Sequence, residues 1–457
     1  MTCWALGDIA ACLDRPLKKL APETVISEVS TDSRTLRQGS LFVPLIGEKF
    51  DGHEYLRGVV EERKAIAVLW SRGEAPQWLK ETNVELFEVP DTLEAYQKLG
   101  LFWRKKCGVR CLAVTGSVGK TTTKEFLAHF LAPFFKLHKS QANFNNDIGV
   151  PKTLLEVTPE HEVVIVEMGM RGPGEIARLV RAAEPEVGII TAVGTSHIEL
   201  LGSREAIARA KGELVAGLPV NGTAVLPAGD DFFDLLVSLS QAPVRSYSGR
   251  AGVGDISPQA VLSQNAESTR FVYQGNEYRL PLPGNHHLHD LFAVLATGAA
   301  LGLAAEALLE HLSELSHPDG RAEWSDIAGA RFYLDAYNSA PESLHASLGV
   351  LKNCPGRRIA VLGDMLELGP AGPGLHAEIG DALTGYGVEL ALCYGDLSRR
   401  IAERGSAAGV DCHWFSDKAE LASFLSANLR PGDSVLVKAS RGMALETVID
   451  ALKERVG

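Results

Sequence analysis

The sequence has few cysteines, no segment that resembles a secretion signal and no long apolar run. Its seven cysteines show no CxxC spacing, which favours reduced thiols over a disulfide framework. Residues 1–8 carry neither a basic nor an apolar segment, so a signal peptide is not expected. The longest uncharged stretch, residues 291–305, is too short to span a bilayer and is predicted to form a buried helix. These absences favour a cytoplasmic protein without a membrane segment.

Basic residues are too few to give the chain a broad positive face. The formal net charge is −12, which argues against extended contact with nucleic acid or an anionic membrane. Hydrophobic residues make up 46% and charged residues 22% of the chain, as in ordinary globular proteins. A length of 457 residues favours about three domains. A monomer is the working expectation.

Strand-like and helix-like segments alternate along the chain, as in α/β proteins. Short β-rich runs precede a helical pattern at 93–104, and the apolar runs at 163–169 and 187–194 are typical of strands buried on both faces of a parallel sheet. We predict three domains: a small α/β domain at 1–106, a central parallel-sheet domain with a phosphate loop at 107–316, and a doubly wound, Rossmann-like domain at 317–457. The turn-forming segment 316–320 is the expected hinge.

A glycine-rich turn separates an apolar run that begins at Val109 from a helical pattern at 121–131. The turn reads Thr115, Gly116, Ser117, Val118, Gly119, Lys120, Thr121, Thr122. The two glycines let the main chain approach anionic oxygens, Lys120 supplies a positive charge, and the Thr121 hydroxyl can ligate Mg²⁺ at the helix start. An incidental turn is the alternative reading. The strand before and the helix after favour a loop that binds the phosphates of ATP.

Three polar residues follow the next predicted strands. Glu167 ends a strand, where a carboxylate can help to hold hydrated Mg²⁺. His197 lies in the loop after the following strand, and the residue alone gives even odds between a site histidine and a surface histidine. Lys211 lies in a helical segment and by itself indicates only a solvated lysine. These residues do not identify a reaction on their own.

Taken together, the ordered motifs of the chain resemble the Mur ligases, and within them the enzymes that add D-alanyl-D-alanine to a UDP-linked muramoyl tripeptide. The motifs that carry the resemblance are STDSR (30–34), FDGH (50–53), TGSVGKTTTKE (115–125), NFNNDIGVPKT (143–153), EMGMRGPGEI (167–176), GTSHIELLGSREAIARAKGEL (194–214), DAYNSAPES (335–343), GDMLELG (363–369) and VKASRGM (437–443). The resemblance implies an ATP-dependent amide ligase that works through an acyl phosphate.

The resemblance also implies roles for individual residues. Lys120, Glu167, His197 and Lys211 would be catalytic. Two Mg²⁺ ions would be held with the help of Thr121, Glu167, His197 and Lys211, and Lys211 would carry a carbamate. The implied contacts of the UDP-muramoyl-tripeptide are Asp32, Ser33, Arg34, Phe50, Asp51, Gly52, His53, Asn143, Asn145 and Asn146. By their position, Asn338 and Asp364 are candidates for the D-alanyl-D-alanine side, and Lys438 and Arg441 for a contact with its carboxylate or with a phosphate.

Two segments depart from the family pattern. The family's G-x-H-N-x-x-N run, whose asparagines approach adenine, appears as residues 284–290, with His287 and Asp290 in place of both asparagines. Asp290 can accept a hydrogen from the adenine amino group but cannot donate to a ring nitrogen, which weakens the expectation of base selectivity. Ser339 stands where the family usually has asparagine, so Asn338 is the firmer expected contact. Arg321 and Asp335 match positions that relatives use around the ATP ribose and phosphates.

Three alternatives remain open at the level of sequence. A folylpolyglutamate-type ligase would lack the STDSR and FDGH motifs, and the Mur ligase that adds the third amino acid usually carries a D-N-P-R run that this chain lacks. A P-loop nucleotide-binding module without ligase activity would leave Glu167, His197 and Lys211 without a task.

Overall fold

The computed structural model describes residues 4–141, 143–316 and 322–456. By the density of their contacts the residues divide into two compact units. The first unit contains residues 1–113, 132–170 and 175–186, and the second contains residues 114–131, 171–174 and 187–457. Among the described residues, no helix is both apolar enough and long enough to cross a membrane.

The N-terminal part is built on a short parallel sheet. Its strand order is β3-β4-β5-β6, and a two-stranded antiparallel ribbon, β1 and β2, precedes it. The elements are β1 Trp4–Ala5, α1 Leu6–Leu13, β2 Val25–Ile26, β3 Val29–Ser30, β4 Leu41–Phe42, η1 Gly52–Tyr55, α2 Leu56–Glu61, β5 Ala67–Trp70, α3 Gln77–Lys80, β6 Glu85–Glu88 and α4 Thr92–Cys107. The carboxylate of Asp91 caps α4 by accepting from the Glu94 N–H at 2.9 Å, and Gly108 ends the helix with a φ of +70°. The expected strands and the helix at 93–104 are confirmed.

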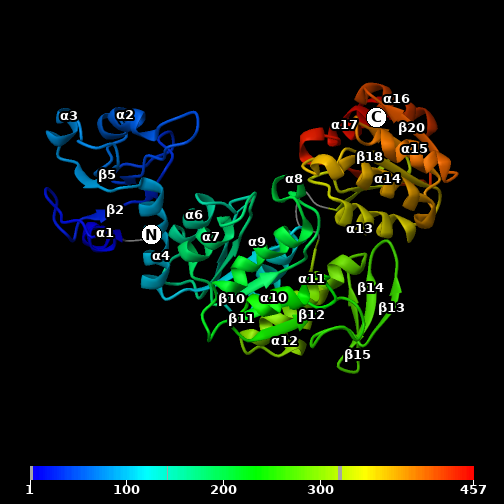
Figure 1. The fold of residues 1–457 in the computed structure, drawn as a ribbon, viewed down its shortest axis with the longest axis horizontal. Coiled ribbons are helices and arrows are strands. Elements are labelled where there is room, and N and C mark those ends of the chain that lie inside the picture. The colour runs from blue at the N-terminus through cyan, green and yellow to red at the C-terminus, as the bar shows by residue number, and fades with distance from the viewer. Residues whose placement is uncertain (1–3, 142, 317–321, 457) are drawn as a thin grey trace. The chain divides into compact units, whose positions relative to one another are not determined.

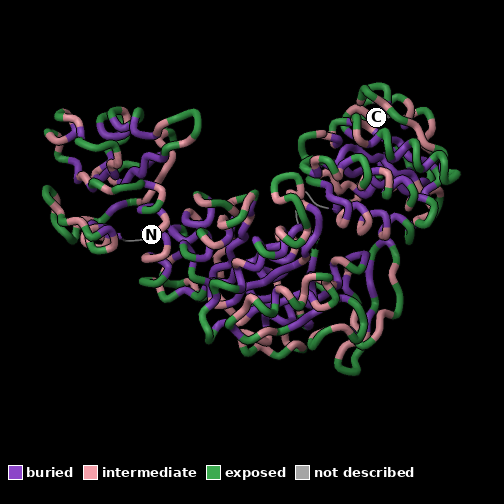
Figure 2. The backbone as a smooth tube through the Cα atoms, viewed as in Figure 1, coloured by how far each residue is buried: buried purple, intermediate pink, exposed green. Residues whose placement is uncertain are grey.

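A six-stranded sheet with the order β12-β11-β10-β7-β9-β8 carries the phosphate loop. Three of its strands, β10, β11 and β12, are labelled in Figure 1. Its elements are β7 Arg110–Thr115, α5 Lys120–Leu131, β8 Leu137–Lys139, α6 Gly149–Leu155, β9 Val163–Glu167, α7 Glu175–Ala183, β10 Val187–Ile190, α8 Ile198–Leu201, α9 Arg204–Ala216, β11 Thr223–Pro227, α10 Phe233–Leu239 and β12 Val244–Tyr247. Every residue of β9 and β10 is buried, as expected for strands covered on both faces. Figure 2 shows much purple, the colour of buried residues, around the position of β10.

An antiparallel three-stranded sheet interrupts the parallel pattern after β12. It consists of β13 Ala260–Gln264, β14 Thr269–Tyr273 and β15 Asn276–Leu280. Sequence patterning did not predict it, because its strands bury few residues and lack the continuous apolar runs of the parallel strands.

The apolar stretch at 291–305 is helical but breaks earlier than expected. Helix α11 is Asn285–Ala300, α12 is Ala305–Leu309, and η2 is Leu312–Glu314. Gly302 has a φ of +82°, and the Leu303 N–H turns back to the Gly298 carbonyl at 2.9 Å. These features end the helix, because a left-handed glycine closes a helix C-terminus.

The C-terminal part is a doubly wound sheet with the order β16-β17-β21-β18-β19-β20. Its elements are β16 Glu323–Ile327, β17 Ala330–Leu334, α13 Pro341–Lys352, β18 Arg358–Gly363, η3 Gly369–Ala371, α14 Gly372–Ala382, η4 Leu383–Tyr386, β19 Leu390–Tyr394, α15 Arg399–Ala407, β20 Asp411–Phe415, α16 Lys418–Asn428, β21 Ser434–Lys438, η5 Arg441–Met443 and α17 Glu446–Val456. Alternate residues of β18 face opposite cores: Ala360 and Leu362 pack in the core of α13, α14 and α15, and Ile359 and Val361 in that of α16 and α17. This confirms the predicted architecture, with β16 as an antiparallel edge strand.

Candidate active site

The phosphate loop has the geometry that its glycines predict. Gly119 has a φ of +82°, where a side chain would strain the backbone, and a Cβ on Gly116 would clash with the hydroxyl of Thr191. Lys120 begins α5, and its Nζ donates to the Gly116 carbonyl at 2.9 Å. Because this contact folds the lysine back along the loop, its charge lies beside the main chain that would surround a phosphate.

The segment after β10 braces this loop. The Thr191 hydroxyl donates to the Val118 carbonyl at 2.5 Å, and the Ser117 N–H donates to the Ala192 carbonyl at 2.9 Å. The Gly194 N–H in turn donates to Ser117 Oγ at 2.9 Å. These bonds hold the loop in one shape. Sequence reasoning missed Thr191 because a threonine in a strand-to-loop transition has no distinctive pattern.

Helix α11 packs against the loop from another side. His287 is buried, its Nδ1 donates to the Pro283 carbonyl at 2.7 Å, and its ring stacks on Phe126 with 6.2 Å between centroids. Asp290 is also buried, and one of its oxygens would lie 3.0 Å from a Cβ on Gly119. His287 and Asp290 therefore pack around the phosphate loop, a role that is independent of any contact with a nucleotide base.

The loop from Gly194 to Glu199 places His197 beside charged groups. His197 has a φ of +65°, and its Nδ1 lies 2.8 Å from Glu367 Oε2. Burial lowers the pKa of His197; the Glu367 carboxylate acts in the opposite direction, and Lys211 and Lys120 lower it further. The histidine is thus predominantly neutral near pH 7, as a metal ligand must be.

Lys211 is buried in α9, so the sequence reading of a solvated lysine was wrong. Its side chain lies among the largest fully buried ones of the described residues. Burial lowers its pKa well below the usual range, and the nearby charge of Lys120 adds to this. The amine of Lys211 therefore loses its proton more readily than that of an exposed lysine.

Glu167 and Asn145 form a pair in the first unit. Asn145 Nδ2 donates to Glu167 Oε1 at 3.0 Å, and Glu167 is buried. Gly169 lies against the Asn145 amide, and its N–H donates to the Asn145 carbonyl at 2.8 Å. Asn146 accepts from two N–H groups at the start of α6, and Asn143 is exposed. Of the three asparagines, only Asn145 is thus brought to a predicted site carboxylate.

The STDSR motif forms a turn closed by its own side chains. Asp32 accepts from the Arg34 N–H and Nε, both at 2.9 Å, and these bonds lower the pKa of Asp32 to about 2. Ser33 lies between them and is partly exposed. The Arg34 guanidinium is exposed and remains accessible to a ligand from its open side.

The FDGH motif forms a second ordered turn. Asp51 accepts from the His53 N–H at 3.0 Å, lies 2.7 Å from His53 Nδ1 and pairs with Arg72. A Cβ on Gly52 would lie 2.7 Å from the Leu45 nitrogen, so only glycine fits. The Phe50 ring is 55% exposed, which is unusual for a residue of its size.

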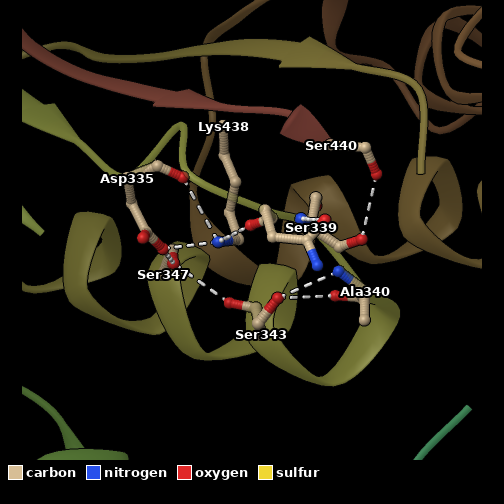
Figure 3. A network of polar contacts seen from close by, with 8 residues as sticks. Asp335, Ser339, Ala340, Ser343, Ser347, Lys438 and Ser440 are labelled. Atoms are coloured by element: carbon tan, nitrogen blue, oxygen red, sulfur yellow. Dashed lines mark hydrogen bonds and ion pairs between the residues drawn. The ribbon is translucent and has the colours of Figure 1, made fainter. Parts of the chain in front are cut away.

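Three predicted residues of the C-terminal sheet, Asp335, Asn338 and Lys438, are joined by a partly buried network around the Lys438 amine (Figure 3). Lys438 Nζ donates to Asp335 Oδ2 at 2.5 Å and to the Asn338 carbonyl at 3.0 Å. Ser347 Oγ donates to the same Asp335 oxygen at 2.7 Å. Lys438 and Asp335 thus form one ion pair and neutralise each other. The sequence predicts two separate ligand contacts for these residues.

Asp364 and Arg441 lie apart from that network, and the Asn338 side chain has a separate contact. Asp364 is buried and accepts from the Ser398 N–H at 2.7 Å, so it stabilises the turn after β19. Arg441 is exposed and pairs with Glu446 at 2.9 Å. Asn338 Oδ1 accepts from the Ser339 N–H at 2.9 Å. Arg321 and most of the expected hinge at 316–320 lie outside the described residues.

Two acidic residues at the junction with the central sheet were not singled out from the sequence. Glu342, near the start of α13, accepts from the Thr195 N–H at 2.8 Å, and its carboxylate fills the space left by Gly194. Glu367, in the GDMLELG motif, lies beside His197. Their partners are about 150 or more residues away in the sequence, so local patterns could not reveal them.

Comparison with known proteins identifies the family. The Mur ligase middle domain matches residues 114–298, and the Mur ligase glutamate ligase domain matches residues 320–441. A UDP-N-acetylmuramoyl-tripeptide–D-alanyl-D-alanine ligase of Synechocystis is 40% identical, with 98% of this chain and 97% of the relative covered.

Solved structures agree with the sequence comparison. MurF from Acinetobacter baumannii superposes with a TM-score of 0.90 at 28% identity, covering 99% of both chains. MurF ligase from Thermotoga maritima, solved in complex with ADP, superposes with a TM-score of 0.83 at 25% identity over 94% of this chain and 97% of that one. From the phosphate loop, the doubly wound C-terminal sheet and this similarity over nearly its whole length, the chain belongs to the Mur ligase family of ATP-dependent, ADP-forming ligases.

Proposed function

We propose that the chain joins D-alanyl-D-alanine to UDP-N-acetylmuramoyl-tripeptide in peptidoglycan precursor synthesis, as a cytoplasmic monomer. The terminal carboxylate of the tripeptide attacks the γ-phosphorus of ATP, giving an acyl phosphate and ADP. The amine of the dipeptide then displaces phosphate and loses a proton, which forms the amide. The observation that carries the proposal is the similarity to tripeptide ligases along 98% of the chain, combined with a braced phosphate loop.

The phosphate loop accounts for the first step. Lys120 and the N–H groups at the start of α5 neutralise charge on the transferring phosphoryl group, together with the dipole of the helix. Thr115, Gly116, Ser117, Val118, Gly119 and Thr122 complete the proposed triphosphate site. His287, Asp290, Arg321 and Asp335 are the proposed contacts of the remainder of ATP.

The donors near this loop suit Mg²⁺ bound through the nucleotide. Among the described residues, no group of three His, Cys, Asp or Glu side chains forms a ready-made metal site. Mg²⁺ at a nucleotide is commonly held by phosphate oxygens and water with only a few protein ligands, and this arrangement needs no such cluster. We propose Thr121, Glu167, His197 and Lys211 as those ligands, for two ions. Bound Mg²⁺ would stabilise the charge of the phosphates.

Lys211 becomes a suitable ligand after reaction with carbon dioxide. Burial lowers the pKa of this amine and so favours its neutral form, which carbamate formation requires: the nitrogen bonds to the carbon of CO₂ and releases one proton. The product carries a negative charge and two oxygens. Such a group reverses the charge at position 211 and supplies the anion that two cations need.

The three expected domains divide the substrates among them. Residues 1–106 bind the UDP end, with Phe50 offering an exposed ring for stacking and Arg34 a cation for a phosphate. The central domain, residues 107–316, holds ATP, and Asn143, Asn145 and Asn146 meet the muramoyl peptide. In residues 317–457, Asn338, Asp364, Lys438 and Arg441 serve the dipeptide. Lys438 acts by ordering Asn338, since it donates to that residue's carbonyl.

A phosphate-release assay tests this reaction. The purified chain is supplied with ATP, Mg²⁺ and UDP-muramoyl-tripeptide, and phosphate is measured with and without D-alanyl-D-alanine. We expect release to depend on the dipeptide, with the pentapeptide product seen by mass spectrometry. Release that ignores the dipeptide, or that requires a folate and glutamate, would reject the proposal.

The phosphate loop is tested by one substitution and a matched control. Lys120→Ala should abolish ATP consumption without unfolding the chain, because the lysine lies at the surface of a braced loop. Lys98→Ala removes the charge of an exposed lysine on α4 and should leave turnover unchanged. Full turnover by Lys120→Ala would remove this loop from the mechanism.

A further inference from the structure

Two carboxylates from the C-terminal sheet lie against the loop Gly194–Glu199. Glu342 accepts from the Thr195 N–H at 2.8 Å and from its hydroxyl at 3.2 Å. Glu367 lies 2.8 Å from His197 Nδ1, and the Glu199 N–H contacts the Glu367 carbonyl at 3.4 Å. The same loop binds Ser117 of the phosphate loop through Gly194. It is therefore held from both sides.

The contact between His197 and Glu367 is made by two strained residues. Their φ values are +65° and +63°, in a region that residues other than glycine rarely adopt. Each belongs to a motif near a strand end, and His197 Nδ1 is buried. Strained backbone that persists at a functional site is usually held there by its contacts.

The nitrogen that faces Glu367 is not accessible to a metal or a phosphate. Because Nδ1 is buried beside a carboxylate, any other ligand of the ring must approach through Nε2. The 2.8 Å contact lies outside the geometry of a regular hydrogen bond. A carboxylate so close still favours a protonated Nδ1, because it accepts hydrogens and does not donate them. That tautomer leaves the lone pair on Nε2, as metal-binding histidines require, and a carboxylate behind the ring is their common support.

We propose that Glu367 is a positioning residue for His197, which keeps the hydrogen on Nδ1 and presents Nε2 to the metal or phosphate side of the site. This inference rests on the proposed function of His197. The carboxylate comes from the loop after β18 in the C-terminal sheet, so a correctly oriented His197 depends on that sheet lying against the loop. Glu342 supports the arrangement by fixing Thr195, two residues earlier.

The His197–Glu367 contact is not explained by a contribution to the stability of the fold. The Glu367 side chain is 55% exposed, and ion pairs with such exposure contribute little to stability. Orientation of the imidazole is a different effect, because it changes which nitrogen carries the lone pair and does not require a strong contact.

The tautomer can be observed directly by long-range ¹⁵N–¹H NMR on the full chain with labelled histidines. The chain contains 13 histidines, and the His197 signals are assigned by their loss in His197→Gln. We expect Nδ1–H in the wild type, a shift toward Nε2–H in Glu367→Ala, and retention of Nδ1–H in Glu367→Gln, whose amide oxygen still accepts. Glu420→Gln removes a charge from an exposed site on α16 and serves as the control. An unchanged tautomer in Glu367→Ala would overturn the proposal.

Metal binding provides a second readout that does not depend on turnover. Mn²⁺ replaces Mg²⁺, a non-hydrolysable ATP analogue is added, and free Mn²⁺ is counted by electron paramagnetic resonance. We expect about tenfold weaker Mn²⁺ binding in Glu367→Ala, in the range for supports of metal-binding histidines, and wild-type binding in Glu420→Gln. If His197→Gln also binds Mn²⁺ normally, the proposed ligand role of His197 fails. If His197→Gln is weak and Glu367→Ala is normal, only the positioning role fails.

Discussion

The Thr123 hydroxyl donates to Asp290 Oδ1 at 2.9 Å, joining residues that are 167 positions apart. Thr123 lies in the first turn of α5, three residues after Lys120, and Asp290 lies in α11. Asp290 also lies against Gly119, so it contacts the phosphate loop and the helix that follows it. The acid that replaces a family asparagine therefore has a structural task in this chain.

Replacement of Asp290 by alanine should destabilise the fold. The buried Thr123 hydroxyl would lose its acceptor, which typically costs about 1–3 kcal/mol in the free energy of unfolding. Asp290→Asn keeps an acceptor oxygen and should stay within about 1 kcal/mol of the wild type. Urea denaturation of the three proteins measures both values. Equal stability of wild type and Asp290→Ala would show that the bond is dispensable.

The same variants test base selectivity. Because Asp290 is bonded to Thr123, we expect Asp290→Asn to change the ratio of kcat/KM for ATP and GTP by less than about tenfold, which corresponds to 1.4 kcal/mol. A larger gain in preference for ATP would show that the residue at 290 reaches the base.

Lys211→Met should stabilise the chain in buffer depleted of carbon dioxide. The folded-state pKa of Lys211 is lowered, so between that pKa and the unfolded value near 10.5 the unfolded state binds a proton that the native state lacks. Stability of the wild type therefore rises with pH in this window, by at most about 1.4 kcal/mol per pH unit. The advantage of the methionine variant should shrink toward pH 10.5. Parallel pH profiles from denaturant titrations would contradict this.

His376 should make the GDMLELG loop sensitive to acid. Its Nδ1 donates to the Gly372 carbonyl at 2.7 Å, and its Nε2 accepts from the Met365 N–H at 2.9 Å. Burial lowers the pKa of His376 below its usual 6.5, against smaller opposing effects from the Gly372 carbonyl and Asp364. Protonation would place a second hydrogen opposite the Met365 N–H.

Because the pKa of His376 is lowered in the folded state, acid should destabilise the loop. As pH falls below 6.5, the unfolded state binds the proton before the native state, so stability contributed at neutral pH is lost. We expect faster hydrogen exchange at the Met365 amide at pH 5.5 than at pH 7.5, after correction for intrinsic rates. His376→Leu should expose this amide at both pH values. Equal protection of the wild type at both would contradict the assignment.

Two substitutions at Glu367 separate backbone strain from side-chain function. Glu367→Gly and Glu367→Ala both remove the carboxylate, but only glycine adopts a φ of +63° without strain. The glycine variant should be more stable than the alanine variant by about 1 kcal/mol, whereas ligase activity should fall equally in both, by about tenfold or more. Thermal unfolding and kcat measure the two effects. Activity restored by glycine would assign the role of residue 367 to the backbone.

The parts of the site that could be predicted from sequence are local. The phosphate loop depends on Gly116, Gly119 and Lys120 within five residues, and each is required by the conformation or charge of that one turn. The order of β7, loop and α5 is equally local. Such a pattern is visible without knowledge of the fold.

The remainder depends on contacts between distant segments. Lys438 and Asp335 are 103 residues apart, and their ion pair changes the expected picture of two separate substrate ligands. Lys211 could not be identified as buried from its helix, because α9 has only weak amphipathic patterning and its neighbours decide its surroundings. Strands β13 and β15 escaped prediction for the opposite reason: they bury too little to produce a clear pattern.

The close fit of Gly194 against Glu342 restricts how this junction can evolve. A Cβ at position 194 would lie 2.5 Å from the Glu342 carboxyl carbon, so a side chain there requires the Glu342 carboxylate to move away from the Thr195 N–H. A side chain at 194 therefore acts against the Glu342–Thr195 contact, and loss of the acid at 342 removes that conflict. Homologous chains should therefore show correlated substitution at these two positions.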